Sequence, residues 1–383
     1  MMRRMKPEQL IEAATIAAGL TDFSGDDYRP GLNALLASFD ASAEPNGIGE
    51  PTLEALVTST LAARLQVTDW WAQHPELADE QIAEPIFIVG VSRSGTTALS
   101  HLLSVDPAVR SPRQWEAQAP VPPPEAATYD TDERHLAAIE ADENSIIHAL
   151  NPGFKAMHHD PPNMPTECVP VMAQNMVSLQ FNAMFHLPDY ADFLLAVDHV
   201  PTYEQHKRVY QLLQSRHPGR WVLKTPHHAL AVDAIAEVYP DARFVWTHRD
   251  PATCIASTAS ISCGLGSTFS DADHRVAAGE LWTTLLTEMI DRTADARRRH
   301  GDRFVDVDYR QLVADPLATT AQLYDDLDID LSAEAEQRMA AHVSEHRQHR
   351  FGRHEYALAD FGLDADELNE PLAAYRATYG LDS

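Results

Sequence analysis

The sequence contains little cysteine, and its cysteines do not form a pattern that would build a covalent or metal-held framework. Only three of the 383 residues are cysteines, namely Cys168, Cys254 and Cys263. Their number is odd and no C-x-x-C pair occurs, which argues against a disulfide scaffold and against a zinc finger. We therefore expect free thiols in a protein of a reducing compartment, the cytoplasm.

Long apolar runs are also missing from the chain. No window approaches about 18 uninterrupted apolar residues, so we expect no transmembrane segment. The N-terminus MMRRMKPEQLIEAATIAAGL begins with basic residues as a signal peptide does, but Glu8 and Glu12 interrupt its apolar part. Its apolar residues recur at helical spacing instead, which predicts a soluble amphipathic helix.

Basic residues are scarce: 29 Lys and Arg stand against 57 Asp and Glu, which gives a formal net charge of −28. A surface of this charge repels nucleic acid and anionic lipid, so neither is an expected partner. Any anion-binding site has to be built locally from a few basic residues. Since 44% of the residues are hydrophobic, the chain has enough apolar side chains for a full core.

The chain does contain a regular succession of strand-like and helix-like segments. Segments whose apolar residues recur at helical spacing, such as Glu280 to Arg299, separate four short β-rich runs. These runs are PIFIVG from Pro85, RWVLKTP from Arg220, ARFVWTHRDP from Ala242 and RFVDVDY from Arg303. The alternation predicts an α/β fold with a central parallel sheet flanked by helices, and ligands gather at the carboxyl ends of such strands.

The same pattern divides the chain into three parts. Residues 1–80 carry helical patterns without strand signals, which predicts a helical N-terminal addition packed on the core. Residues 81–320 hold the predicted α/β core, with a helical insertion at about 120–215 between proline-rich loops. We expect residues 321–383 to form a helical and loop segment that closes over the ligand site. The oligomeric state stays open, with a homodimer as one alternative.

A glycine-rich loop follows the first predicted strand. It reads GVSRSGTT, and Gly90 and Gly95 have the separation found in phosphate-binding loops of nucleotide triphosphatases, where Lys stands in place of Thr96. A strand, a Gly-rich turn and a helix N-terminus together expose backbone N–H groups that attract a phosphate. Arg93 supplies a guanidinium that can hold two oxygens of a phosphate or sulfonate. The loop therefore predicts an anion site.

The loop resembles that of sulfotransferases that use 3′-phosphoadenosine 5′-phosphosulfate (PAPS), whose pattern is P-x-[RK]-[ST]-G-T-[TS]. The match begins at the basic residue, and Ser92 replaces the proline that the family usually has nearby. The resemblance extends over 86–309, and HEYALADFGL at 354–363 resembles the C-terminal end of bacterial members. It implies a P-loop-like fold and a 5′-phosphosulfate site formed by Arg93, Ser94, Gly95, Thr96 and Thr97.

A second candidate phosphate site lies in THRDPATCIAS. The family binds the 3′-phosphate with an Arg at the end of a later strand and a Ser eight residues on, and Arg249 and Ser257 have this spacing. Independently of the family, Asp250 and Pro251 signal the start of a helix whose dipole favours an anion near Arg249. Two phosphate sites on one sheet fit a bis-phosphorylated nucleotide better than a triphosphate.

Catalytic candidates follow from the chemistry of sulfuryl transfer. Lys224 in VLKTPHH ends a predicted strand and resembles the family's lysine that points toward the sulfuryl group. Together with Arg93 it would stabilise charge on the departing nucleotide. The acceptor hydroxyl also needs a general base, for which Glu167 and His158 are favoured. The open alternatives are Glu116, His159, His227 and His228.

No metal is expected for this reaction, although the pair Asp306 and Asp308 at a strand end keeps a magnesium site as an alternative. The basic run HRQHRFGRH at 346–354 suggests a cationic flap over the nucleotide, with Arg350 and Arg353 as candidates. The insertion carries apolar residues that suit either an acceptor surface or plain helix core. They are Met172, Met176, Phe181, Met184 and Phe185.

The favoured function is transfer of a sulfuryl group from PAPS to a hydroxyl of a small apolar or lipid-like acceptor, by in-line displacement. One alternative is an ATP-dependent kinase with a degenerate phosphate loop, which would need magnesium. The other is a nucleotide-binding scaffold without catalysis.

Overall fold

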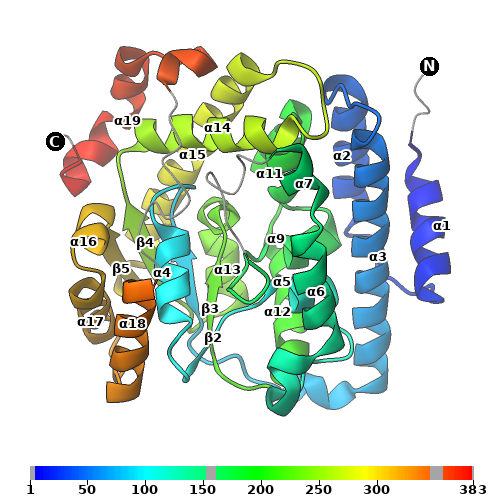
Figure 1. The fold of residues 1–383 in the computed structure, drawn as a ribbon, viewed down its shortest axis with the longest axis horizontal. Helices are drawn as coiled ribbons and strands as arrows, with labels where there is room; N and C mark the ends of the chain where they lie inside the picture. Colours follow the sequence, from blue (N-terminus) through cyan, green and yellow to red (C-terminus); the bar gives the residue numbers. More distant parts are fainter. Residues whose placement is uncertain (1–4, 152–160, 346–356, 382–383) are drawn as a thin grey trace.

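The protein is built on a five-stranded parallel sheet with the strand order β2-β3-β1-β4-β5 (Figure 1). We describe it from a computed structural model in which residues 5–151, 161–345 and 357–381 are placed. The chain leaves the central strand β1 toward one edge, forms β2 and β3, and returns to build β4 and β5 on the other side. The strands are β1 (Ile86–Val89), β2 (Val109–Arg110), β3 (Arg220–Lys224), β4 (Arg243–His248) and β5 (Phe304–Asp308).

This architecture confirms the predicted α/β fold, and each of the four predicted runs contains a strand. The short continuous runs of apolar and β-branched residues are typical of parallel strands that are buried on both faces. The sequence did not reveal β2, because two residues are too short to show any periodicity.

The two faces of the sheet are covered by separate apolar cores, as alternation along a strand requires. In β1, Ile86 and Ile88 belong to a smaller core beneath α4 (Thr96–Leu103) and the helices that follow β5. Phe87 and Val89 point to the opposite face and join the larger core.

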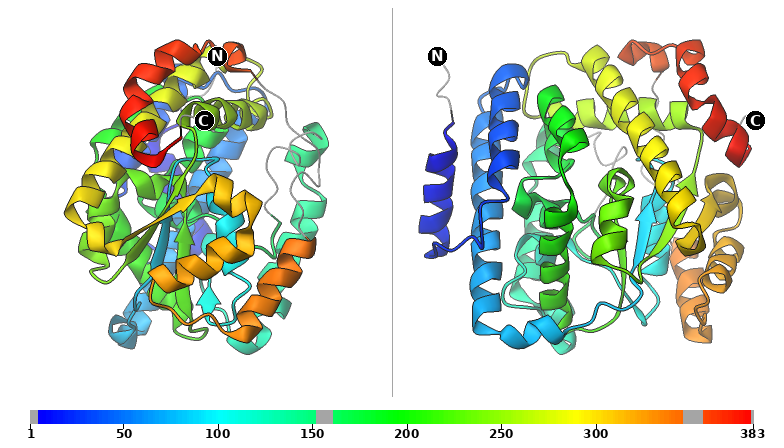
Figure 2. Two further views of the ribbon diagram at one scale, coloured as in Figure 1. Left: turned by 90° about the vertical axis from the view of Figure 1, so that its left-hand side faces the viewer. Right: turned by 180° about the vertical axis from the view of Figure 1, so that it is seen from behind.

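The N-terminal residues form three helices, α1 (Pro7–Ala18), α2 (Arg29–Ser42) and α3 (Gly49–Gln73), which stand together at one end of the molecule (Figure 1). The view from behind shows the same arrangement, with the helices after β5 at the opposite end (Figure 2). Leu53, Val57 and Leu61 line the buried face of α3 and are fully inaccessible. Their spacing of four residues is the amphipathic pattern that the sequence displays.

Helices and short 3-10 turns connect the remaining parts of the chain. Between β2 and β3 lie α5 (Gln114–Gln118), η2 (Ala126–Thr131), α6 (Glu133–Glu143), α7 (Ile146–Leu150), α9 (Val169–Met172), η3 (Ala173–Asn175), α10 (Gln180–Met184), α11 (Pro188–Ala196) and α12 (Val200–Gln214). The later elements are η4 (Pro226–Leu230), α13 (Val232–Val238), α14 (Pro251–Gly266), α15 (Arg275–Arg299), η5 (Gly301–Arg303), α16 (Tyr309–Ala314), α17 (Pro316–Asp326), α18 (Ala333–Glu345), η6 (Leu358–Phe361) and α19 (Ala365–Tyr379). Before β1 there is one such turn, η1 (Pro75–Asp79).

The three cysteines are free thiols, as the sequence predicted, with Cys168 and Cys254 buried and Cys263 partly buried. Burial raises the pKa of Cys254 to about 12, so this thiol is protonated at neutral pH. Within the described ranges, no helix combines the length and the apolar character that a bilayer crossing needs.

Candidate active site

The loop that joins β1 to α4 is folded tightly against the neighbouring strand β4. The Ser94 hydroxyl donates a hydrogen bond to the Val91 carbonyl at 2.6 Å and lies 2.7 Å from Thr247 Oγ1. A Cβ at Gly90 would lie 2.3 Å from the same Thr247 oxygen, so only glycine permits this approach. Ser94 is fully buried. Its side chain therefore fixes the loop from within, and its hydroxyl does not line the cavity described below.

Arg93 and Gly95 both take the left-handed backbone conformation, with φ of +70° and +97°. Glycine is required at position 95 for a second reason, because a Cβ would lie 2.8 Å from Cδ2 of Tyr309. The turn directs the Arg93 side chain toward α14, where its Nε donates a hydrogen bond to Ser257 Oγ at 3.2 Å. The two predicted phosphate sites therefore meet in one place.

Arg249 follows β4 and stands directly before α14. Asp250 caps this helix by accepting a hydrogen bond from the Thr253 backbone N–H at 2.9 Å, as its sequence position predicted. The Arg249 guanidinium donates to the Arg93 carbonyl at 2.7 Å and lies 4.3 Å from the ring centroid of Tyr309. These contacts hold Arg249 next to the glycine-rich loop.

One cavity of about 770 Å³ is lined by both arginines. It opens where the strand order reverses beside β1, the place at which ligands bind in open α/β sheets. Residues from α16, the start of α17 and α18 complete its lining. Besides Arg93 and Arg249, its lining includes Gly95, Thr96, Thr97, His101, Tyr309, Leu312 and His342.

The last described helix, α19, contacts the residues on either side of Arg249. Tyr379 stacks on His248 with 3.7 Å between ring centroids, and Tyr375 Oη lies 2.9 Å from His248 Nδ1. Arg376 forms an ion pair with Asp250 at 2.7 Å. Burial alone would raise the pKa of the Asp250 carboxyl, but hydrogen bonds at the helix N-terminus and from Arg376 hold it below its ordinary value.

Lys224 stands at the end of β3. It contacts both α4, the helix that follows the glycine-rich loop, and the segment that carries Glu167. Its ammonium nitrogen lies 2.9 Å from Thr97 Oγ1 and 2.8 Å from Glu167 Oε1. Thr225 Oγ1 lies 3.3 Å from the other carboxylate oxygen of Glu167. Lys224 is only 3% exposed, whereas the Glu167 side chain is 26% exposed. A carboxylate and an ammonium group are thus held beside Thr97 at the start of α4, and the carboxylate is the more exposed of the two.

Glu116, one of the open alternatives for the general base, is instead a structural residue. It is fully buried, and its carboxylate pairs with Arg110 at 2.6 Å. It also accepts hydrogen bonds from Tyr129 Oη at 2.7 Å and from the Arg113 backbone N–H at 3.1 Å. With every oxygen engaged inside the protein, Glu116 has no access to a substrate hydroxyl.

His227 and His228 also do not suit a general base. Both lie in η4 directly after Lys224, but their rings are fully buried and turn into the larger core. His228 Nδ1 contacts Tyr203 Oη at 2.7 Å, and His227 Nε2 lies 3.3 Å from His199 Nδ1. Burial lowers the pKa of both histidines well below 6.5, so both are neutral core residues. The remaining candidates His158, His159, Arg350 and Arg353 lie outside the described residues.

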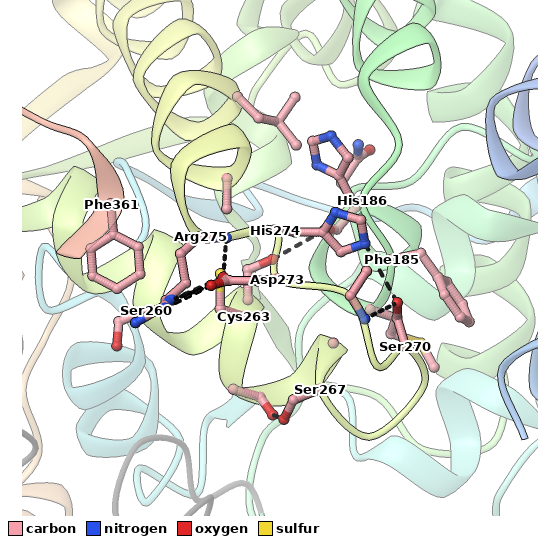
Figure 3. A pocket seen from close by; sticks show the side chains of 18 of the residues that line it. Phe185, His186, Ser260, Cys263, Ser267, Ser270, Asp273, His274, Arg275 and Phe361 are labelled. Atoms are coloured by element: carbon pink, nitrogen blue, oxygen red, sulfur yellow. Dashed lines mark hydrogen bonds and ion pairs between the residues drawn. The ribbon is translucent and has the colours of Figure 1, made fainter. Parts of the chain in front are cut away.

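The apolar residues of the insertion were expected to form either an acceptor surface or plain helix core, and the structure places some of them in a core and others along a cavity. Met172, Met176 and Phe181 are fully buried in the larger core. Met184 and Phe185 line a second cavity of about 620 Å³ at the C-terminal end of α14. Figure 3 shows this cavity, in which the rings of His186 and His274 stack with centroids 4.9 Å apart.

Asp306 and Asp308, which the sequence offered as an alternative magnesium site, do not converge on the cavity lined by Arg93 and Arg249. The Asp306 carboxylate forms a bidentate contact with Arg297, at 2.8 and 2.6 Å, and also contacts His248 Nε2 at 2.9 Å. Asp308 caps α16 and pairs with Arg310 at 2.7 Å. Neither residue lines the cavity.

Tyr309 and Thr247 were not recognised as site residues in the sequence. Tyr309 lies beneath the Arg249 guanidinium, and Thr247 anchors the glycine-rich loop. Both stand at or near the carboxyl end of a predicted strand, in VWTH and VDVDY. A search for polar and aromatic residues at those ends would have found them.

Comparisons with known proteins agree with this geometry. The profile described as "Sulfotransferase family" matches residues 85–334. The fold is similar to the crystal structure of sulfotransferase STF9 from Mycobacterium avium, with a TM-score of 0.92 and 30% identity over 100% of this chain and 99% of that chain. Sulfotransferase STF1 from Mycobacterium tuberculosis H37Rv matches with a TM-score of 0.86 and 33% identity, over 97% of this chain and 99% of that one.

A more distant relative is the omega-hydroxy-beta-dihydromenaquinone-9 sulfotransferase Stf3 of Mycobacterium bovis, which is 24% identical over 316 residues, 78% of this chain and 77% of that protein. The profile match covers the whole sheet together with the loops that carry Arg93, Lys224 and Arg249. The predicted family is thereby confirmed, and the chain belongs to the sulfotransferase family.

Proposed function

We propose that this sulfotransferase takes its sulfuryl group from PAPS and transfers it to a hydroxyl of an apolar, lipid-like acceptor. The observation that carries the proposal is the joint lining of one cavity by Arg93 and Arg249, which come from two different strand-to-helix turns. Two cationic side chains on one cavity suit a ligand with phosphate groups at both ends. A protein with a net charge of −28 needs such a local cationic site to bind any anion.

In this proposal the glycine-rich loop and the start of α4 hold the 5′-phosphosulfate, through Arg93, Gly95, Thr96 and Thr97. Arg249 and Ser257 hold the 3′-phosphate. The guanidinium of Arg249 is preorganised for this role, because its contacts with Tyr309 and the Arg93 carbonyl fix its orientation. Binding then requires little further ordering of the side chain.

The reaction is an in-line displacement at sulfur. The acceptor oxygen forms the new S–O bond while the bond from sulfur to the bridging phosphate oxygen breaks, and the electron pair remains on that oxygen. We assign Lys224 and Arg93 to stabilise this developing negative charge, a contribution of the oxyanion-hole type. We assign Glu167 to accept the hydroxyl proton, since its carboxylate lies 2.8 Å from Lys224 Nζ and is partly exposed.

We place the apolar body of the acceptor in the cavity that Figure 3 shows. Helix α14 connects the two cavities, since Ser257 in its first half contacts Arg93 and Cys263 in its second half lines the acceptor cavity. At 1.5 Å per residue these two positions are about 9 Å apart along the helix axis. The Mycobacterium bovis relative is named for a menaquinone derivative with an omega-hydroxyl group, which supports an acceptor with a hydroxyl on a large apolar body.

A thermal-shift series tests the donor. Adenosine 3′,5′-bisphosphate, ADP and ATP are each added with and without magnesium, and ligand at a hundredfold excess over its Kd stabilises the protein by about 2.7 kcal/mol. We expect the largest shift with the bisphosphate, independent of magnesium. A larger, magnesium-dependent shift with ATP would overturn the proposal in favour of a kinase. If adenosine 3′,5′-bisphosphate stabilises the protein but no alcohol is sulfated, the protein would instead be a nucleotide-binding scaffold without catalysis.

Transfer of labelled sulfate from PAPS to a series of alcohols tests the acceptor. Primary alcohols of increasing chain length are compared with a phenol and with a sugar of similar size. We expect kcat/KM to rise with apolar chain length, because each buried methylene contributes about 0.8 kcal/mol. A value that is highest for the sugar would contradict the proposed acceptor class and leave the donor assignment intact.

A further inference from the structure

A cluster of three potential metal ligands lies in the interior, apart from both cavities. Cys168 directly precedes α9, His206 lies in α12 and His228 lies in η4. One ligand atom from each side chain lies within 4.8 Å of the other two. All three side chains are fully buried, so the cluster is not a chance meeting of surface groups.

The two imidazoles are hydrogen-bonded on one side only. His206 Nδ1 contacts Tyr239 Oη at 2.7 Å, and His228 Nδ1 contacts Tyr203 Oη at the same distance. The Nε2 atom of each ring is buried and has no hydrogen-bond partner among the residues that the structure places. Buried polar atoms are rarely left in this state, and an ion or a water that is held between them is the usual reason.

The donor set identifies the class of ion. A thiolate together with two neutral imidazoles suits Zn²⁺ and Cu⁺, which accept sulfur and nitrogen ligands and impose no strict geometry. The tyrosine contacts at Nδ1 match the outer hydrogen bonds that orient ligating histidines. Tyr210 Oη, 3.4 Å from Cys168 Sγ, is placed to donate to the thiolate. Binding displaces the proton of the Cys168 thiol, since the thiolate is the form that ligates.

We propose that Cys168 Sγ, His206 Nε2 and His228 Nε2 bind one buried d10 cation, Zn²⁺ or Cu⁺. This proposal does not depend on the identity of the sulfuryl donor or acceptor. The ion sits behind the pair formed by Lys224 and Glu167 without touching a substrate. It therefore has a positioning role.

The position of the cluster explains how the ion acts on that pair. Cys168 is the next residue after Glu167, and its backbone N–H donates a hydrogen bond to the Lys224 carbonyl at 2.9 Å. His228 stands four residues after Lys224, in the turn that leaves β3. A cation bound by these side chains joins both segments to α12. It thereby limits the relative movement of the Lys224 ammonium and the Glu167 carboxylate.

Metal content is the direct test. The full chain is expressed in medium supplemented with zinc or, separately, with copper, because a fully buried site loads during folding. A brief wash with a chelator removes ions from surface histidines, and the metal that remains is measured by mass spectrometry. We expect about one ion per chain, and the medium from which that ion is retained distinguishes Zn²⁺ from Cu⁺.

Cys168→Ser is the informative variant, and Cys254→Ser is its matched control because Cys254 is also a buried thiol but lies outside the cluster. We expect metal content to fall at least tenfold in Cys168→Ser and to stay unchanged in Cys254→Ser. If Cys168→Ser does not fold, His206→Gln replaces it. Cobalt substitution gives a second readout, a thiolate-to-cobalt absorption that disappears with Cys168.

Two results would overturn the proposal. Folded wild-type protein that retains less than about one tenth of an ion per chain from either medium would show that water, not metal, joins the imidazoles. Equal metal content in wild type and in the folded Cys168→Ser variant would place the ion elsewhere.

Discussion

The ammonium nitrogen of Lys224 lies 2.8 Å from the nearer carboxylate oxygen of Glu167, and the two residues reach this contact from β3 and from the segment before α9. The pair stands beside Thr97 at the start of α4. The cation that we assign to the leaving oxygen and the carboxylate that we assign as the base are thus held next to each other, and each can be replaced separately.

Replacing Lys224 by methionine removes the charge and retains most of the volume of this buried side chain. We expect kcat to fall about 10²- to 10³-fold, because loss of one donor to a developing oxyanion costs about 2.7 to 4 kcal/mol. The affinity for adenosine 3′,5′-bisphosphate should change much less, as measured by calorimetry. Lys207→Met is the control, since Lys207 contacts the Val238 carbonyl and does not line the cavity of Arg93 and Arg249. A kcat within threefold of wild type would refute the role of Lys224.

Glu167→Gln and Glu116→Gln form a second matched pair. Glu167→Gln should lower kcat by about 10²- to 10⁴-fold, the usual contribution of a general base, with little change in stability. Glu116→Gln should instead lower the free energy of unfolding by about 3 kcal/mol, because it breaks a buried ion pair with Arg110. Urea denaturation and steady-state kinetics measure both effects. The assignment fails if Glu167→Gln is as active as wild type.

Arg249→Ala should abolish the preference for a 3′-phosphate. Wild-type protein should bind adenosine 3′,5′-bisphosphate more tightly than adenosine 5′-monophosphate by about 10- to 100-fold, since hydrogen bonds to a charged group contribute about 1.5 to 3 kcal/mol. In the variant the two affinities should become similar. Titration calorimetry with both nucleotides gives the ratio. An unchanged ratio would mean that Arg249 does not contact this phosphate.

His199 makes folding stability depend on pH. Burial lowers the pKa of its imidazole to about 4 from an ordinary value near 6.5. The folded state binds this proton less readily than the unfolded state. The contribution of neutral His199 to the free energy of unfolding is therefore complete above pH 6.5 and is lost as the pH falls toward 4. The difference of about 2.5 pH units corresponds to about 3 kcal/mol.

Urea denaturation between pH 7 and pH 4 measures this dependence. The free energy of unfolding of wild-type protein should decrease over this range, and that of His199→Phe should decrease less steeply. Parallel curves for the two proteins would show that His199 does not titrate with the expected difference.

The sheet was predictable from the sequence because β1, β3 and β4 are short, continuous apolar runs that lie buried in the structure. PIFIVG is a continuous β-rich run, RFVDVDY alternates apolar and acidic residues at its end, and the Asp250–Pro251 pair marks the start of the next helix. The residues of the glycine-rich loop could be named because their spacing is local. The structure added their mutual orientation, above all the contact between Arg93 and Ser257.

Two features could not be read from the sequence, for different physical reasons. Periodicity says nothing about which residues of a 3-10 turn point inward, so His227 and His228 remained candidates for the base although the core encloses them. The cluster of Cys168, His206 and His228 has ligands from three separate elements. No sequence spacing marks a site that only tertiary packing assembles.

The attachment of α19 to His248 and Asp250 has a consequence for control of the enzyme. Because Arg249 stands between these two residues, and His248 is itself the last residue of β4, a displacement of α19 would move the end of that strand together with Arg249. If Arg249 binds the nucleotide as we propose, the position of α19 sets how firmly the product nucleotide is held, and with it the pace of turnover.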